Sequence, residues 1–374
     1  MKKWLLIICM MFMLGGCGKE TPENVLSNLK KEVTNIKSYK ITGNMEISND
    51  EETFTYSLES YYLKDNYYKV ILVNQTNNHE QIILKNNDDI YVITPALNKS
   101  FKFQSEWPGN SSQAYLLGNI IKDIEKDAKT EVTEGENGYI IKTSVNYPNN
   151  ADLKYQKIYL NDKKMIEKVE VYDENDIVKI KVTFDNMDLK AGLKENDFKL
   201  EEYIKEQPKN ENNNSDEKSE KTCENDSETS CEEQINNNET SDNTTNDNTL
   251  NNKTEETTNI ENIIYPLYIP SNTYLTSSET IETGNGNRVI LTFSGEKNFV
   301  LIEEATIANC DMEIVPVYGE PLLLSESIGA LSANSLSWDV NNISYYLAST
   351  ELTVSEMQSI ANSLGNTTLV SNTK

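Results

Sequence analysis

The 374-residue sequence contains a single histidine, His79, and this scarcity narrows the chemistry open to the protein. A Ser–His–Asp or Cys–His catalytic site would have to use His79, which lies in a polar stretch between two apolar runs, where we expect a solvated turn histidine. The sequence has no His/Cys cluster with zinc-ligand spacing and no glycine-rich phosphate loop. We therefore expect no metal, no cofactor and no enzymatic activity, although the many carboxylates leave an acid/base pair open.

Cysteine is also scarce, with five in the chain. Cys9 and Cys17 lie in or directly after the N-terminal apolar segment, so only Cys223, Cys231 and Cys310 remain, too few for a disulfide framework. Cys223 and Cys231 could pair in an oxidising compartment, and the sequence leaves that question open.

Positive charge is outnumbered, because 60 acidic residues stand against 34 basic ones and give a formal net charge of −26. A nucleic acid is itself a polyanion, so this balance excludes nucleic acid as a partner. An acidic body is also not expected to lie flat on an anionic membrane.

Long hydrophobic runs are absent as well. The most apolar stretch, from Trp4 to Leu14, is 11 residues long, shorter than the roughly 18–20 that a spanning helix requires. Two lysines precede it, and Gly15-Gly16-Cys17 follows, which is typical of a secretory signal cleaved before a lipid-modified cysteine. We predict a signal peptide over residues 1–16 and a diacylglyceryl anchor on Cys17.

Two acyl chains on Cys17 would hold the protein durably on a membrane, since each buried methylene contributes ~0.8 kcal/mol. Only three residues separate Cys17 from Thr21-Pro22-Glu23, which predicts the start of a helix through its N-cap, proline and acidic residue. The rest of the chain would then lie on the extracytoplasmic side, with its first domain close to the membrane.

The first domain, predicted over residues 17–204, changes its hydrophobic period from helical to alternating. Val25, Leu29 and Val33 repeat at helical spacing and predict a helix over 22–36. From Tyr39 onward apolar and polar residues alternate. Strands are predicted around 39–47, 54–58, 66–74, 80–86, 89–94, 99–104, 138–146, 153–160, 165–172 and 177–184. So many short strands predict an antiparallel meander that curls to bury one face.

A second helix is predicted at about 112–127, where Leu117, Ile120 or Ile121, and Ile124 form one apolar stripe. Asn110, Ser111 or Ser112 could cap it. Two helices, 22–36 and 112–127, could then cover the open side of the sheet around an apolar interior.

One block of sequence carries a family resemblance. Residues 95–113, which include Leu97-Asn98-Lys99-Ser100-Phe101-Lys102-Phe103-Gln104-Ser105 and Trp107-Pro108, together with the opening helix and the meander, resemble the LolA-like lipoproteins of spore-forming Firmicutes, among them the germination lipoprotein GerS. The resemblance covers roughly residues 20–204. It implies an α+β fold with a curved antiparallel half-barrel capped by helices around a hydrophobic cavity. In the Gram-negative carrier this cavity shelters lipoprotein acyl chains, but a chain acylated at Cys17 could not diffuse as a soluble shuttle.

Four aromatic residues in or near this block are the candidate ligand or partner surface: Phe101, Phe103, Trp107 and Tyr115. The alternative for each is ordinary core packing.

Residues 205–258 contain almost no aromatic or branched apolar residue and are rich in Asn, Glu, Ser and Thr. Such a composition cannot offset the entropy of ordering, so we predict a disordered acidic linker. We expect the small α+β domain at 259–374 to lie on this tether.

The small domain is predicted to contain strands at 288–294 and 298–305, a third pair near 313–318 and 343–348, and a strand at Trp338. Thr353 and Glu356 form a capping box for a last helix with Met357, Ile360, Ala361 and Leu364 on one face. This order resembles a domain of unknown activity that follows LolA-like regions in related lipoproteins and ends some anti-sigma factors. The resemblance implies binding or sensing.

The functional expectation follows from the resemblance. It implies a non-enzymatic adaptor in sporulation or spore germination, lipid-anchored on the cell membrane or outer forespore membrane, that binds a cortex-modifying N-acetylmuramoyl-alanine amidase. The alternatives are a lipid-handling protein whose cavity holds an acyl chain and an envelope sensor.

Overall fold

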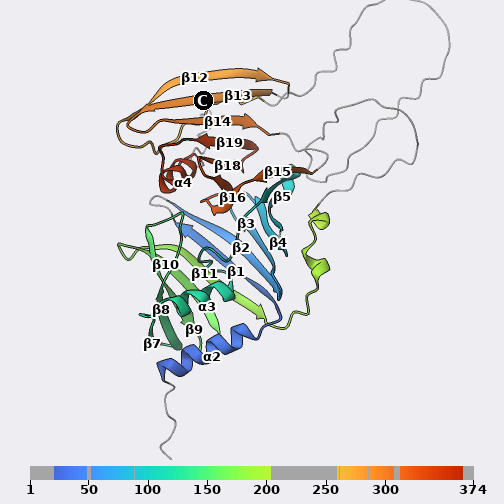
Figure 1. The fold of residues 1–374 in the computed structure, drawn as a ribbon, viewed down its shortest axis with the longest axis vertical. Helices are drawn as coiled ribbons and strands as arrows, with labels where there is room; N and C mark the ends of the chain where they lie inside the picture. The colour runs from blue at the N-terminus through green and yellow to red at the C-terminus, as the bar shows by residue number, and fades with distance from the viewer. Residues whose placement is uncertain are drawn as a thin grey trace, which may run out of the picture.

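The computed structural model describes residues 21–48, 52–87, 89–203, 259–260, 262–284, 286–306 and 312–364. These residues form two mainly antiparallel sheets with helices packed on them (Figure 1). The predicted signal peptide, Cys17, the linker 205–258 and the pair Cys223–Cys231 lie outside the described residues, and these assignments stay predictions. Within the described part, no helix is long and apolar enough to cross a membrane.

Helix α2 (Pro22–Thr34) opens the first part of the structure as predicted. Thr21 is its N-cap, and the Thr21 hydroxyl accepts a hydrogen bond from the backbone N–H of Asn24. Val25 and Leu29 are buried against the sheet, so the helical stripe seen in the sequence is the face that packs.

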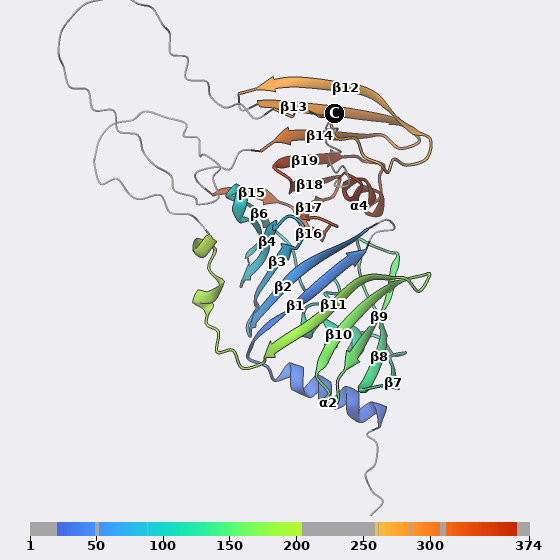
Figure 2. The same cartoon turned by 180° about the vertical axis from the view of Figure 1, so that it is seen from behind.

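The first sheet has twelve strands. The chain builds one half of it from the middle outward and then the other half from the opposite edge back to the middle. Its order is β15-β6-β5-β4-β3-β2-β1-β11-β10-β9-β8-β7, so the first and last strands of the meander pair directly. The strands that come from the first part of the chain are β1 (Ser38–Ser48), β2 (Thr53–Leu63), β3 (Tyr67–Asn74), β4 (Glu80–Asn86), β5 (Asp89–Thr94), β6 (Lys99–Phe103), β7 (Glu131–Gly135), β8 (Gly138–Ser144), β9 (Leu153–Leu160), β10 (Ile166–Asp173) and β11 (Val178–Asp188). The sheet curves around one apolar core and does not close (Figures 1 and 2). A short 3₁₀ turn, η1 (Pro95–Leu97), joins β5 to β6.

Helix α3 (Leu117–Lys126) lies on the concave side of the sheet and contacts α2 and β8. It begins at Leu117, and the predicted cap at Asn110, Ser111 or Ser112 is wrong. The Ser112 hydroxyl instead accepts a hydrogen bond from the N–H of Asn146 (2.8 Å), and the Ser112 N–H donates to the Asn146 carbonyl (2.7 Å). Ser112 therefore ties the loop before α3 to the loop after β8.

The convex side of β3–β5 carries a second, smaller apolar cluster that sequence reasoning missed. The turns η2 (Glu195–Phe198) and η3 (Leu200–Tyr203) lie over it, and Phe198 and Leu200 pack on Ile82, Leu84 and Ile93. These strands are buried on both faces, which explains their nearly continuous apolar sequence.

The second sheet has seven strands in the order β12-β13-β14-β19-β18-β17-β16. They are β12 (Thr273–Thr283), β13 (Gly286–Gly295), β14 (Phe299–Ala305), β16 (Gly319–Leu323), β17 (Ile328–Ser332), β18 (Ser335–Val340) and β19 (Ile343–Ala348). Helix α4 (Val354–Asn362) buries Met357, Ile360 and Ala361 against this sheet. The predicted fold class, a helix-capped half-barrel plus a small α+β part, is confirmed.

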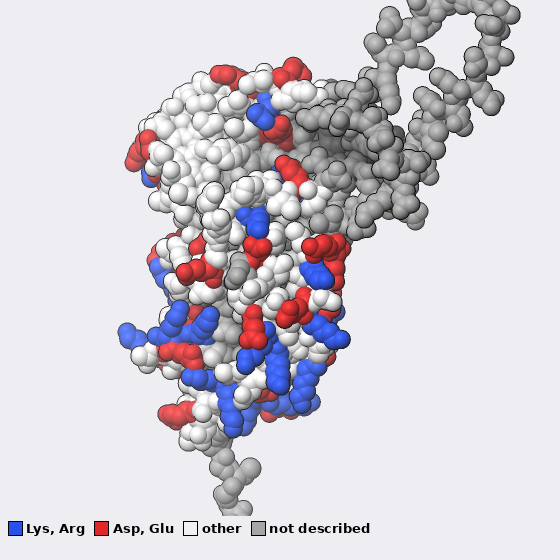
Figure 3. All heavy atoms as spheres, turned by 45° about the vertical axis from the view of Figure 1, so that its right-hand side comes forward, with Lys and Arg blue, Asp and Glu red and all other residues white. Residues whose placement is uncertain are grey.

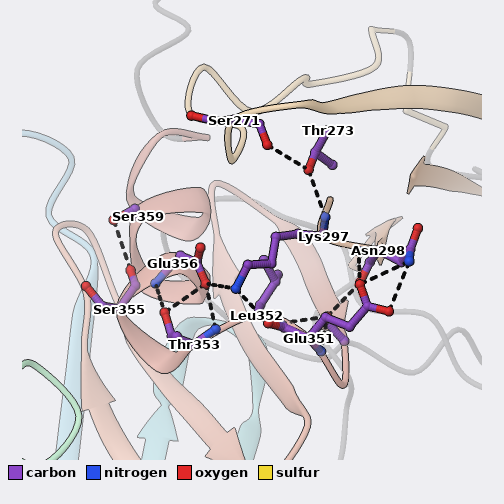
Figure 4. Close-up of polar contacts among 11 residues, drawn as sticks. Ser271, Thr273, Lys297, Asn298, Glu351, Leu352, Thr353, Ser355, Glu356 and Ser359 are labelled. Atoms are coloured by element: carbon purple, nitrogen blue, oxygen red, sulfur yellow. Dashed lines mark hydrogen bonds and ion pairs between the residues drawn. The ribbon is translucent and has the colours of Figure 1, made fainter. Parts of the chain in front are cut away.

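The capping box predicted for α4 is present. The Thr353 hydroxyl accepts from the Glu356 N–H (3.2 Å), and the Glu356 carboxylate accepts from the Thr353 N–H (2.8 Å) (Figure 4). Lys297 reaches the same carboxylate from the β13–β14 turn (3.3 Å), and the Asn298 amide contacts the Glu351 carboxylate (3.0 Å). These contacts hold the start of α4 against the β13–β14 turn.

One predicted pairing is wrong. The strand at 313–318 does not pair with the strand at 343–348. Strand β15 (Glu313–Val317) instead adds in parallel to β6 at the edge of the first sheet. Strand β19 pairs with β14 and β18 instead. The second part of the chain is thus joined to the first by a shared sheet edge, which nothing in the sequence indicated.

Candidate functional site: the mouth between the two sheets

The contact between the two sheets lies at the end of the half-barrel opposite α2 (Figure 1). Strand β15 pairs with β6 along five residues, and two further backbone bonds flank this ladder. The Glu313 N–H donates to the Asn98 carbonyl (2.7 Å), and the Gln104 N–H donates to the Val317 carbonyl (3.1 Å). The block 95–113 therefore lies directly at the junction.

Polar side chains cross the same junction. Lys99 forms an ion pair with Asp339 (2.9 Å), and Asp339 is only 1% exposed. The Gln81 side chain accepts from the Ile328 N–H, and the Tyr56 hydroxyl donates to the Ser325 carbonyl. The Asn110 amide also donates to Glu320. Buried groups of this kind are costly when unpaired, so each bond fixes the docking of the second sheet.

A small apolar contact accompanies these bonds, because Ile328 and Ala330 of β17 are buried in the core of the half-barrel. The second sheet thus contributes residues to the first core and closes part of its mouth.

A cavity of about 220 Å³ remains at this mouth. Its buried walls come from both parts of the chain and are mostly apolar. They are formed by Ile83, Trp107, Tyr115, Leu153, Ile180, Leu322 and Ile328. Its partly exposed edge carries amide and hydroxyl side chains, including Gln113, Asn149, Asn150, Ser355, Gln358 and Ser359. An apolar pocket with a few polar groups around its opening is typical of a binding site.

One group at the cavity is unusual for a buried polar atom. The Ser325 residue is 1% exposed, and its hydroxyl has no hydrogen-bond partner among the described residues. Burial raises the pKa of the neighbouring Glu326 carboxyl to about 7, and the negative charge of Glu52 adds to this effect. A polar group left unpaired beside a cavity is available to a ligand.

The charge around the mouth is predominantly negative. Asp152, Glu320 and Lys179 line the cavity, and Lys179 is paired with Asp173 (3.8 Å). In the described part of the second sheet, the cations Arg288 and Lys297 are both paired with glutamates. Lysines gather instead over the lower part of the face in Figure 3, below the second sheet.

The four predicted aromatic residues divide into two pairs. All four are buried, between 2% and 4% exposed, and all belong to the half-barrel core. Trp107 and Tyr115 also line the mouth cavity, whereas Phe101 and Phe103 of β6 do not. Phe103 borders a separate, shallower depression beside Glu106 and Glu320. Their role toward a ligand or partner stays a prediction.

His79 differs from the solvated turn residue that was expected. Its Nε2 atom is buried without a hydrogen-bond partner among the described residues, and burial lowers its pKa, partly opposed by the charge of Asp339. In the part of the chain that the structure describes, no three His, Cys, Asp or Glu side chains are placed to hold a metal ion.

Sequence reasoning missed the contribution of the second sheet to this site. Leu322, Leu323, Ser325 and the face of α4 that carries Ser355 and Ser359 line the cavity. Their sequence pattern shows only that they lie in or near a core. Their place in the cavity wall depends on how the two sheets dock.

An open sheet with two helices across its concave side and a cavity at its mouth defines a helix-capped half-barrel protein. The chain matches the family described as "Sporulation protein YdcC-like" over residues 1–198. It is also 32% identical over 353 residues to the sporulation protein YdcC of Bacillus subtilis (strain 168), which covers 94% of this chain and 92% of that relative. The chain therefore belongs to the YdcC-like sporulation protein family.

The chain also matches solved structures, at low sequence identity and low TM-score. The complex of the CwlD amidase with the GerS lipoprotein from Clostridioides difficile includes a chain 20% identical, with a TM-score of 0.28, covering 45% of this chain and 96% of that one. The MucA/MucB complex of Pseudomonas aeruginosa includes a chain 8% identical, with a TM-score of 0.30, covering 90% and 97%.

Proposed function

We propose that this protein is a membrane-anchored extracytoplasmic lipoprotein that acts as a non-enzymatic adaptor in sporulation and spore germination. The role in sporulation is supported by the family to which the chain belongs. The observation that favours binding is the mouth cavity, which is built from both parts of the chain and has an apolar wall and a polar edge.

The anchor in this proposal is a diacylglyceryl group on Cys17, which would fix the protein to the outer face of the cell membrane or to the outer forespore membrane. Replacing Cys17 by Ala should release the protein into the medium or intermembrane space, because two acyl chains supply most of the membrane affinity. Cys9→Ala, a change within the predicted signal peptide, is the matched control and should stay anchored. A Cys17→Ala protein that still sediments with membranes would disprove the anchor.

The partner in this proposal is a cortex-modifying N-acetylmuramoyl-alanine amidase, which the resemblance of the 95–113 block implies. The alternative is a lipid acyl chain held in the LolA manner. Affinity capture of the tagged protein from sporulating cells, followed by mass spectrometry of protein and lipid, separates the two. We expect a stoichiometric amidase without lipid; bound lipid with no protein partner would support the alternative.

A further inference from the structure

We propose that the mouth cavity binds one bulky apolar side chain of a protein partner, presented on a segment that also carries lysine or arginine. This inference rests on the proposed function, since it takes the cavity as the site through which the adaptor engages its partner. It names the chemistry of that partner and distinguishes it from a lipid.

The size of the cavity suits one side chain. An apolar cavity of roughly 150 Å³ holds a benzene molecule, so the 220 Å³ present here are enough for a leucine, phenylalanine or tryptophan side chain. A sixteen-carbon acyl chain has more than twice the carbons of benzene, whereas the cavity is about one and a half times as large as the benzene cavity, so the chain would have to extend beyond it. The concave interior behind the cavity is filled by the half-barrel core, including Leu116, Ile120 and Val182, each 0% exposed.

The edge of the cavity suits a peptide backbone. Gln113, Asn149, Asn150 and Gln358 carry amides. Gln113 donates one hydrogen to Ser111, and Gln358 donates one to the Leu323 carbonyl, but each amide also has a second hydrogen and an oxygen that a peptide backbone could use. The Ser325 hydroxyl adds a buried group without a partner among the described residues. A hydrocarbon chain could satisfy none of these groups.

Charge complementarity selects a cationic segment. The carboxylates of Asp152 and Glu320 line the cavity, whereas Lys179, which also lines it, is paired with Asp173. The whole chain carries a formal net charge of −26. An acidic segment would be repelled from this opening, and a lysine or arginine next to the inserted side chain would be attracted.

Defined peptides test the inference on the full-length protein. The probes are fluorescein-labelled peptides of the form Lys-Gly-X-Gly-Lys with a capped C-terminus, where X is Trp, Leu or Gly, measured by fluorescence anisotropy. We expect the Trp or Leu peptide to bind at least about tenfold more tightly than the Gly peptide. Replacing both flanking lysines by glutamate should weaken binding by about tenfold or more. Added salt should weaken the binding of the lysine peptide, because it screens the attraction between the charges.

Two variants localise the binding. Ser359→Phe places a ring on α4 where that helix lines the cavity, and it should abolish the preference for Trp or Leu over Gly. Ser363→Phe, at the C-cap of α4 and outside the cavity lining, is the matched control and should keep the preference. If Ser359→Phe does not fold, as judged by circular dichroism, Ser355→Phe at the other end of the same lining face replaces it.

The inference is overturned by equal binding of all peptides or by a preference that survives in Ser359→Phe. It is also overturned if a fluorescent palmitate analogue binds the wild type, is lost in Ser359→Phe and is not displaced by the Trp peptide. If the peptides fail while Cys17→Ala still releases the protein and an amidase is still captured, the adaptor function stands and this cavity is not its site.

Discussion

The interior of each sheet and the contact between the two sheets are built differently. Inside each sheet the buried side chains are mostly aliphatic and aromatic, as in the clusters around Ile120 and Leu301. The contact between the sheets depends on polar groups, such as Lys99 with Asp339 and Gln81 with Ile328. Each sheet therefore has a core of its own, whereas the docking that forms the mouth cavity depends on a few specific bonds and on Ile328 and Ala330, which β17 adds to the core of the half-barrel. A buried polar group that loses its partner is costly, so single substitutions should distinguish the stability of each core from the stability of the docking.

The largest effect is expected in the cores. Ile120→Ala in α3 and Leu301→Ala in β14 each truncate a fully buried side chain and should cost about 4 kcal/mol of unfolding free energy. Each change should lower the hydrogen-exchange protection of its own sheet and leave most of the other sheet unchanged. Equal loss of protection in both sheets for either change would show a single cooperative unit instead of two cores.

The next effect is expected at the junction. Lys99→Met leaves Asp339 buried without its cation and should cost about 3 kcal/mol in urea unfolding of the docked structure. Lys102→Met is the control on the same strand, because its ion pair with Asp89 is about half exposed and should cost less than about 1 kcal/mol. The double variant Lys99→Met with Asp339→Leu should recover part of the loss. A Lys99→Met protein as stable as the control would contradict a docking role for this pair.

Each of the two parts of the structure also contains a buried carboxyl group, and the titration of the two groups can be compared. Burial raises the pKa of Glu303 in β14 to about 7, and one of its oxygens has no hydrogen-bond partner among the described residues. The folded state therefore favours the protonated form, and stability falls as the pH rises from about 4.5 through 7. Glu303→Gln should raise stability by about 2 kcal/mol at pH 8 and by little at pH 4, as measured by urea unfolding. A stabilisation that is the same at both pH values would contradict this account.

Neutralising the corresponding carboxyl in the half-barrel should change the stability less. Burial raises the pKa of Asp123 in α3 to about 6, while a hydrogen bond from the Gln156 amide (2.9 Å) opposes the shift. Stability should fall as the pH rises from about 4 through 6. Asp123→Asn should therefore raise stability by about 1–2 kcal/mol at pH 8 and leave it nearly unchanged at pH 3.5. Destabilisation at pH 8 would show that the charged form is the one the fold requires.

The meander could be predicted from the sequence because its strands alternate between a buried and an exposed face. The alternation from Tyr39 to Ile47, for example, matches β1 with its buried Ile41 and Met45. Strand β7 was not predicted, since its five residues are mostly exposed and carry no apolar alternation. Strand β12 was missed for the same reason.

The candidate site was predictable only in part. Trp107 and Tyr115 were selected as aromatic residues of a distinctive block, and both line the cavity. Ser325 and Ser359 could not have been selected, because their place at the mouth depends on β15 crossing to β6. Strand pairing between distant segments leaves little trace in local periodicity, so the junction had to come from the structure.

The docking of the second sheet is the central claim, since it creates the mouth cavity, and two backbone amides report on it directly. The N–H groups of Glu313 and Gln104 donate to Asn98 and Val317 across the junction. Hydrogen–deuterium exchange of the full-length protein should show both amides protected in the wild type and both exchanging markedly faster in Lys99→Met, while amides of β1 and β11 stay protected. Rapid exchange of Glu313 and Gln104 in the wild type would contradict the docked arrangement and the site built on it.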